Sequence, residues 1–220
     1  MTARAHLVYD PPAMDVRVVR HPLVEDVLAA LRDRRTPCDV FRQLARRVSV
    51  LLVAEATRDL PLREGTVETP LEATAVSRLA ARVVAVPVLR AGLGMLDGFL
   101  ELVPQAQVGY FGLERDEHTA VARQYYEKVP KDLAGAVVFL LDPMLATGGS
   151  AAMAIAGLAK LGARDVRLLS IVATPEGIAL LRAATPDATV YTAAIDRGLD
   201  ARKFILPGLG DFGDRLFGTY

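Results

Sequence analysis

Hydrophobic positions near the start of the chain recur every three to four residues, over 23–31 and again over about 40–57. That spacing places apolar side chains on one face of a helix, so two amphipathic helices are expected, the second with Asp39 as its N-cap. Residues 1–20 are expected to form a loose start or an edge strand. The polar stretch 58–72 is expected to be an extended strand pair that leads to the next element.

From residue 82 onward, short apolar runs rich in β-branched residues alternate with glycine-containing turns and helical segments. Strands are expected at 83–89, 107–113, 136–141, 165–173 and 188–193, and helices follow the first, third and fourth of them. Alternation of strand and helix is typical of a parallel or mostly parallel sheet with helices on both faces. The pattern therefore predicts an α/β fold.

Two stretches do not fit this alternation. Residues 114–131 are polar, charged and too long for an ordinary strand–helix connection, as is typical of lids that close over binding sites. The tail from 196 to 220 is rich in Gly and Asp and shows no helical period, and its apolar residues 204–207 predict that it packs back onto the domain. Asp196 and Asp200 are expected to be solvated at the entry to this tail.

Composition and charge restrict the function. A length of 220 residues fits one domain, and 26 basic against 26 acidic residues leave no net charge, which argues against bulk capture of nucleic acid. One cysteine, Cys38, excludes an internal disulfide framework and a cysteine-based zinc site. No apolar run is long enough to span a membrane, and the start lacks a signal-peptide pattern. A cytoplasmic protein without nucleic-acid or membrane partners is expected.

The strongest chemical signal lies directly after the expected strand 136–141. It reads Asp142, Pro143, Met144, Leu145, Ala146, Thr147, Gly148, Gly149 and Ser150. Glycines at the start of a helix let backbone amides approach an anion, hydroxyls add donors, and the helix terminus adds positive potential. Neither the P-loop nor the dinucleotide-binding pattern is present. The Thr-Gly-Gly turn alone could be an ordinary joint, but Asp142 upstream favours a cradle for a phosphate monoester.

This run resembles the phosphoribosyl-diphosphate (PRPP) signature of type I phosphoribosyltransferases, and its Asp-Pro variant is similar to the uracil phosphoribosyltransferase family. Further segments carry the same resemblance: 21–23, 55–60, 87–95, 112–117, 125–130, 173–178 and 205–219. The resemblance implies the type I phosphoribosyltransferase fold in a single domain over 1–220. It implies an N-terminal helical arm at 1–60, a PRPP-binding core at 82–195 with a flexible lid at about 114–131, and a uracil-binding hood at 196–220.

The resemblance also implies the role of each candidate residue in transferring phosphoribose from PRPP to uracil, which gives UMP and diphosphate. Arg90 and Arg115 would hold the diphosphate, Asp142 the ribose hydroxyls, the turn 147–150 the 5-phosphate, and Asp211 would face the ribose and its metal. Catalytic roles thus go to Arg90, Arg115 and Asp211, and the whole run 142–150 binds PRPP. The edge of uracil would be read at Ile205, Gly210, Asp211 and Phe212.

The resemblance further implies Mg²⁺ carried by PRPP without a dedicated protein cluster, GTP as a possible activator, and a homodimer or homotetramer. The chain departs from the family at Lys203-Phe204, where Gly-Tyr is usual, at Phe212, where many bacterial members have alanine, and in the lid residues 117–120. Three alternatives stay open: transfer to another base, a nucleotide-sensing RNA-binding regulator, and an inactive paralogue.

Overall fold

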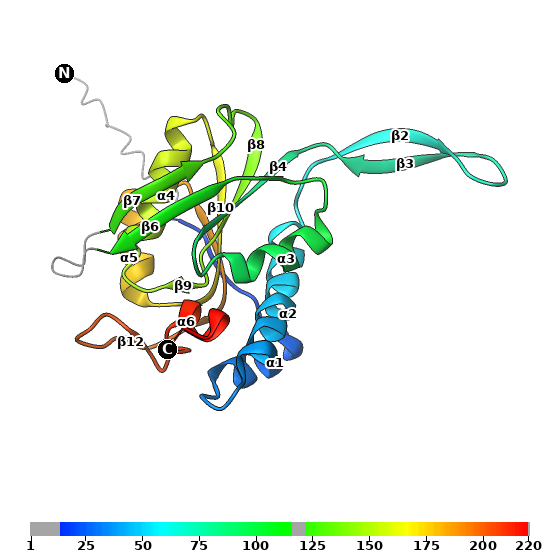
Figure 1. The fold of residues 1–220 in the computed structure, drawn as a ribbon. Coiled ribbons are helices and arrows are strands. Elements are labelled where there is room, and N and C mark those ends of the chain that lie inside the picture. The colour runs from blue at the N-terminus through cyan, green and yellow to red at the C-terminus, as the bar shows by residue number, and fades with distance from the viewer. Residues whose placement is uncertain (1–13, 116–121, 220) are drawn as a thin grey trace, which may run out of the picture.

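A sheet of nine strands forms the centre of the computed structural model, which describes residues 14–115 and 122–219 (Figure 1). The strands are β1 (Val16–Val18), β4 (Arg82–Leu89), β5 (Gln107–Val108), β6 (Tyr110–Arg115), β7 (Ala122–Lys128), β8 (Ala136–Leu141), β9 (Met144–Leu145), β10 (Asp165–Ala173) and β11 (Thr189–Ile195). Their main order is β1-β11-β10-β8-β4-β6-β7, and every neighbouring pair on this path is parallel except β6 and β7. The expected mostly parallel sheet is confirmed.

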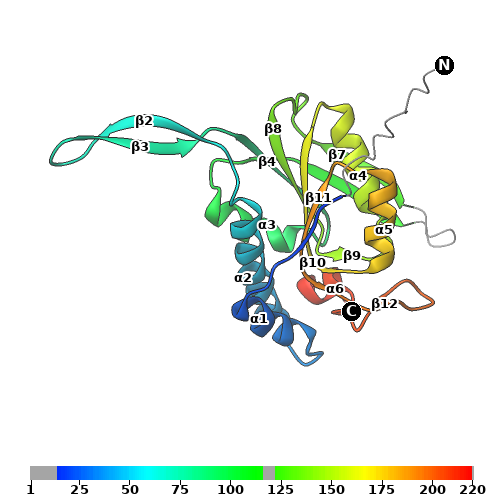
Figure 2. The same cartoon turned by 180° about the vertical axis from the view of Figure 1, so that it is seen from behind.

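Helices cover both faces of this sheet, as Figures 1 and 2 show from opposite sides. On one face lie α1 (Pro22–Arg32), α2 (Cys38–Ala56) and α3 (Leu93–Leu102), and on the other lie α4 (Gly149–Lys160) and α5 (Pro175–Ala184). Successive side chains of β4 alternate between the two layers, since Val83 packs in the first and Val84 in the second. Burial on both faces explains why β8 is apolar at all its positions.

The N-terminal elements match the expected helices and edge strand but differ in two details. The N-cap of α2 is Pro37, and Asp39 lies inside the first turn without capping it, because the helix begins at Cys38, earlier than the apolar stripe indicates. The polar segment forms an antiparallel hairpin of β2 (Leu62–Glu68) and β3 (Ala73–Leu79), which ends later than expected and projects from the body (Figure 1).

Arg167 of β10 joins the end of α2 to the sheet. Its guanidinium, with a side chain 8% exposed, donates to the carbonyl oxygen of Ala56 at 2.6 Å and to the carboxylates of Asp59 and Asp165. The hydrogen bond from Arg167 lowers the pKa of Asp59. These contacts fix the helical layer relative to the strands, and thereby relative to the strand ends that carry the site.

The tail packs back onto the domain, as its apolar residues predict. It contains β12 (Gly198–Leu199), β13 (Ile205–Leu206) and α6 (Phe212–Phe217). The ring of Phe212 contacts that of Phe41 in α2, with centroids 5.1 Å apart. The sequence of the tail shows no helical period, yet the tail contains α6, because a helix of 6 residues is too short for a period to be visible. Across residues 14–115 and 122–219, no helix is both long and apolar enough to cross a bilayer.

Candidate active site

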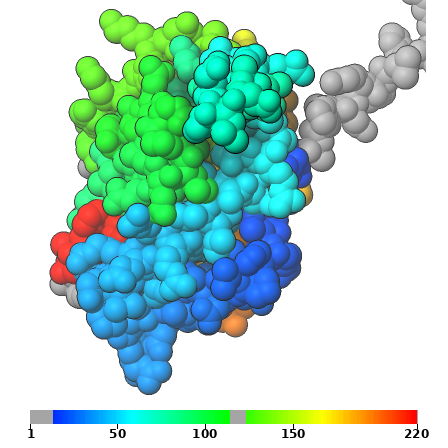
Figure 3. All heavy atoms as spheres, turned by 90° about the vertical axis from the view of Figure 1, so that its right-hand side faces the viewer, coloured from blue at the N-terminus to red at the C-terminus, as the bar shows by residue number. Residues whose placement is uncertain are grey.

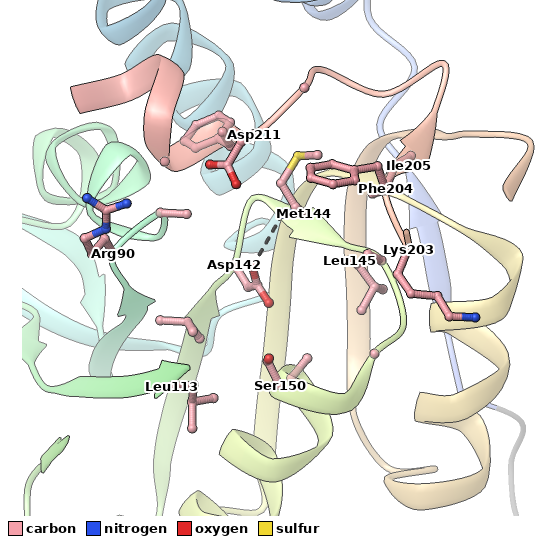
Figure 4. Close-up of a pocket in the computed structure, with 18 of the residues that line it drawn as sticks. Arg90, Leu113, Asp142, Met144, Leu145, Ser150, Lys203, Phe204, Ile205 and Asp211 are labelled. Atoms are coloured by element: carbon pink, nitrogen blue, oxygen red, sulfur yellow. Dashed lines mark hydrogen bonds between the residues drawn. The ribbon is translucent and has the colours of Figure 1, made fainter. Parts of the chain in front are cut away.

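A cavity of about 420 Å³ opens where β4 and β8 end, beside the hood formed by residues 196–219 (Figure 4). Parallel neighbours end at the same edge of a sheet, and ligands of open α/β sheets bind there. Pro87 of β4 pairs with Leu141 of β8, so the residues that follow these strands come together. The predicted site residues that line the cavity are Arg90, Asp142, Met144, Leu145, Ala146, Gly148, Ser150, Ile205, Gly210, Asp211 and Phe212.

Backbone contacts with β10 fix the turn after β8. The amide of Asp142 donates to the carbonyl of Leu169 at 3.1 Å, and the Ser170 hydroxyl donates to the Asp142 carbonyl at 2.6 Å. The carbonyl of Pro143 accepts from the amides of Ile171 and Val172. Pro143 is buried and is not among the residues lining the cavity. Its place in the structure is therefore that of an anchor beneath the cavity wall.

The Thr-Gly-Gly turn packs against the start of α5. Gly148, the N-cap of α4, has φ +80°, and a Cβ there would lie 2.7 Å from the carbonyl oxygen of Gly177. Thr174 at the α5 N-cap donates its hydroxyl to the Ala146 carbonyl at 2.6 Å. Thr147 and Gly149 are outside the set of cavity-lining residues, whereas Gly148 and Ser150 belong to it. Glycine at 148 is thus needed for backbone conformation and for close packing.

Arg90 reaches the hood from the end of β4. Its side chain is 57% exposed, and a guanidinium nitrogen lies 3.3 Å from Oδ1 of Asp214 in α6. Asp211 caps α6 and accepts from the amide of Asp214 at 2.9 Å. In Figure 4 the Arg90 guanidinium and the carboxylates of Asp211 and Asp142 surround one open space. The residues that line the cavity thus include three cationic ones, Arg90, Arg202 and Lys203, and two carboxylates, beside a turn rich in N–H and O–H donors.

Two hood residues at the cavity have side chains that are buried in the core. Ile205 and Phe212 are buried, although both border the cavity. Because the Phe212 ring packs against Phe41, the phenylalanine that replaces the family's common alanine fills the core rather than the cavity. The change of residue at 212 is therefore compatible with a ligand held by main-chain groups.

Arg115 ends β6, next to β4 at the same edge of the sheet, where its backbone pairs with Ala122 of β7. The Arg115 side chain and the lid tip at 116–121 lie outside the described residues. The segment 125–130, which resembles the return strand of the family's lid, overlaps β7, and β7 pairs with β6 in antiparallel fashion. Leu113, two residues before Arg115, lines the cavity, so this strand does reach the site.

Three residues that hold the hood in place, two of them within it, were not singled out in the sequence as binding residues. The expectation that Asp196 is solvated is wrong: its side chain is buried and forms an ion pair with Arg32 of α1. Arg215 of α6 is buried as well, and its guanidinium stacks 4.4 Å above the ring of Phe41 and donates to the Leu209 carbonyl at 2.8 Å. Asp196 directly follows an apolar strand, which was the available signal, but its partner lies 164 positions away.

Lys203 is the position where the chain departs from the family's glycine, and its φ is +68°. A side chain in this left-handed region costs about 1–2 kcal/mol. Lys203→Gly is therefore expected to raise the free energy of unfolding by about 0.5–1 kcal/mol, after the larger chain entropy of unfolded glycine is subtracted. Denaturant melting measures the change. Lys203→Ala is the control, since it removes the ammonium but keeps the strain; equal shifts in both variants would refute this explanation.

A mostly parallel α/β sheet, a glycine-rich helix start after β8 and a C-terminal hood beside the cavity are the arrangement of a type I phosphoribosyltransferase. The uracil phosphoribosyltransferase family model matches residues 18–219, and the chain belongs to this family. It is 50% identical over 205 residues to a uracil phosphoribosyltransferase of Clostridium perfringens, covering 93% of this chain and 98% of the relative.

Two further proteins are similar to this chain over nearly the same length. A uracil phosphoribosyltransferase of Pediococcus pentosaceus is 47% identical over 203 residues, with 92% of this chain and 97% of the relative covered. The solved structure of protein AQ2163 from Aquifex aeolicus superposes with a TM-score of 0.89 at 34% identity, covering 93% of this chain and 98% of that one. The fold expected from the resemblance, with helical arm and hood, is confirmed.

Proposed function

We propose that the protein transfers the 5-phosphoribosyl group of PRPP to N1 of uracil, forming UMP and diphosphate in pyrimidine salvage. One observation carries the proposal: a single cavity joins the phosphate cradle, Arg90, two carboxylates and the backbone of the hood. Family membership gives the reaction class, that of a pentosyltransferase. Each part of the cavity has a counterpart in the two substrates.

In this mechanism the chain places charges and orients the reactants around an oxocarbenium-like transition state. The donors of 147–150 hold the 5-phosphate, and Asp142 holds the ribose hydroxyls. Arg90 and Arg115 stabilise the departing diphosphate, because guanidinium groups match phosphate oxygens in shape and charge. The lid at 114–131 is proposed to exclude water when it closes over the bound substrates.

The hood is proposed to read uracil through main-chain groups at Ile205, Gly210 and Phe212, with Asp211 beside the ribose. Peptide groups suit a fixed acceptor–donor–acceptor edge, because they cannot rotate to satisfy a different one. Cytosine would leave a buried polar group unpaired, which costs about 1–3 kcal/mol.

Magnesium is proposed to enter with PRPP. Among the described residues, no three His, Cys, Asp or Glu side chains cluster in an arrangement that could hold a metal. Asp142 and Asp211 nevertheless bring hard oxygen donors to the cavity wall. These residues fit Mg²⁺, which retains waters and is commonly held by one or two carboxylates together with substrate phosphates. When bound, the ion neutralises part of the diphosphate charge.

A product assay tests the function. Purified protein with Mg²⁺ and PRPP is offered uracil, cytosine, hypoxanthine and adenine separately, and UMP and diphosphate are expected from uracil alone. Turnover of another base would replace the substrate assignment. Binding of PRPP or UMP without turnover would favour an inactive paralogue. Salt-sensitive RNA binding without turnover would favour the regulator.

The remaining expectations are also proposals. A homodimer or homotetramer is supported by the projecting hairpin, since an isolated two-stranded hairpin is marginally stable and Leu71 at its tip is 95% exposed. Figure 3 shows the side from which this hairpin projects, with α1 and α2 below it. Light scattering would show a monomer if the proposal is wrong. Cytoplasmic location rests on the composition of the chain, and one domain over 1–220 rests on its length and on the resemblance. Activation by GTP rests on the resemblance alone, and GTP titration of the uracil assay tests it.

A further inference from the structure

A buried ion pair joins the end of α1 to the segment that enters the hood. Arg32, in the last turn of α1, donates to both carboxylate oxygens of Asp196, at 2.9 Å and 2.6 Å. The Asp196 side chain is only 4% exposed and that of Arg32 is 26% exposed. Two parallel N–H···O bonds of this kind fix the relative orientation of both groups. The pair therefore sets the position of whatever else it contacts.

What it contacts is the peptide backbone of Gly208. The Arg32 guanidinium also donates to the Gly208 carbonyl at 2.9 Å, and the Gly208 amide donates to Oδ2 of Asp196 at 2.9 Å. Both polar backbone groups of this residue are thus held by the same ion pair. Gly208 lies between Ile205 and Gly210, which line the cavity. The ion pair consequently clamps the centre of the turn that borders the base site.

We propose that Arg32 and Asp196 are positioning residues for base recognition. The inference rests on the proposed function, in which main-chain groups at Ile205 and Gly210 read the edge of uracil. A recognition edge made of peptide groups cannot adjust by changing rotamer, so its placement to within about 0.5 Å depends on the residues that support it. Arg32 and Asp196 act on uracil only through the backbone of Gly208.

Two variants distinguish a purely structural role of the ion pair from a role in positioning the hood backbone. Asp196→Asn leaves the charge of Arg32 without its partner, which lowers stability as well as loosening the turn. The double variant Arg32→Met/Asp196→Asn removes both charges, so the melting temperature is expected to recover most of that loss. The double variant loses the guanidinium bond to the Gly208 carbonyl, whereas Asp196→Asn keeps that bond and an amide oxygen that can accept from the Gly208 amide. Stability and base recognition therefore change independently.

Kinetics with both substrates provide the first readout. In the double variant, the KM for uracil is expected to rise about tenfold or more, the KM for PRPP to change less than about twofold, and discrimination against cytosine to fall. Val27→Ala is the control, because Val27 is buried in α1 and its loss lowers stability without touching the clamp. If the double variant regained the wild-type KM for uracil together with its melting temperature, the proposal would be overturned.

Hydrogen exchange in the protein without substrates provides a readout that does not need turnover. Amides over 205–210 are expected to exchange faster in the double variant, while those of β10 stay protected. Unchanged exchange over 205–210 would overturn the clamp itself. Failure of the wild-type protein to form UMP would instead overturn the proposed function and leave the exchange result as the test of the clamp. The two failures are thus distinguishable.

Discussion

Arg90→Met is expected to lower kcat/KM for PRPP by about 10²–10³-fold, the range observed when one preorganised donor to a developing charge is removed. Arg90 is one of the cationic residues that line the cavity, and in the proposed reaction it faces the diphosphate as negative charge accumulates there. Its loss removes an interaction that strengthens in the transition state, so kcat falls as well as affinity. Steady-state kinetics with varied PRPP measure both quantities.

The fold of this variant should be unaffected, because Arg90 is half-exposed and its ion pair with Asp214 is long. Arg46→Met is a closely matched control. Arg46 is 56% exposed and forms an ion pair with Glu101, but it lies outside the cavity. Arg90→Lys should recover only part of the rate, since an ammonium lacks the planar fork. A loss below threefold in Arg90→Met, or an equal loss in the Arg46 variant, would contradict the role given to Arg90.

The parts of the molecule that the sequence predicted well are those whose signal is local. The strand 165–173 matches β10 from end to end, because an apolar run buried on both faces needs no information from elsewhere. Arg90 and Asp142 could be placed together for a similar reason, since each follows a strand of a parallel sheet. The hairpin end at Leu79 was misjudged, because polar residues on an exposed hairpin give no burial pattern.

Contacts between distant segments could not be predicted in this way. Arg32 belongs to a helix that the sequence predicts correctly, yet nothing in its neighbourhood shows that it meets Asp196 across the fold. The expectation of a solvated aspartate was reasonable for a charged residue in a Gly-rich tail, but the guanidinium compensates its burial. The same applies to Arg215, which bonds to the carbonyl of Asp33 at 2.7 Å. Supporting residues therefore emerge only when the tertiary structure is known.

Gly148→Ala is expected to have the second large effect, because two independent costs fall on one residue. An alanine at φ +80° costs about 1–2 kcal/mol, and its Cβ would meet the Gly177 carbonyl at 2.7 Å, so the turn or α5 must shift. A total loss of about 2–4 kcal/mol would lower the melting temperature by roughly 5–15 °C in a chain of this size. The shift also moves the donors of the phosphate cradle, so PRPP affinity should fall by about tenfold or more.

Gly135→Ala isolates the conformational cost. Gly135 has φ +70°, but nothing lies within 4 Å of a Cβ built there, and it is not among the residues that line the cavity. This variant should lose about 1 kcal/mol and keep the wild-type affinity for PRPP. Calorimetric melting and PRPP titration of both variants give the comparison. If Gly148→Ala changed the melting temperature and the PRPP affinity as little as Gly135→Ala does, the turn would not depend on its contact with α5. The role of this turn as the phosphate site would then be contradicted.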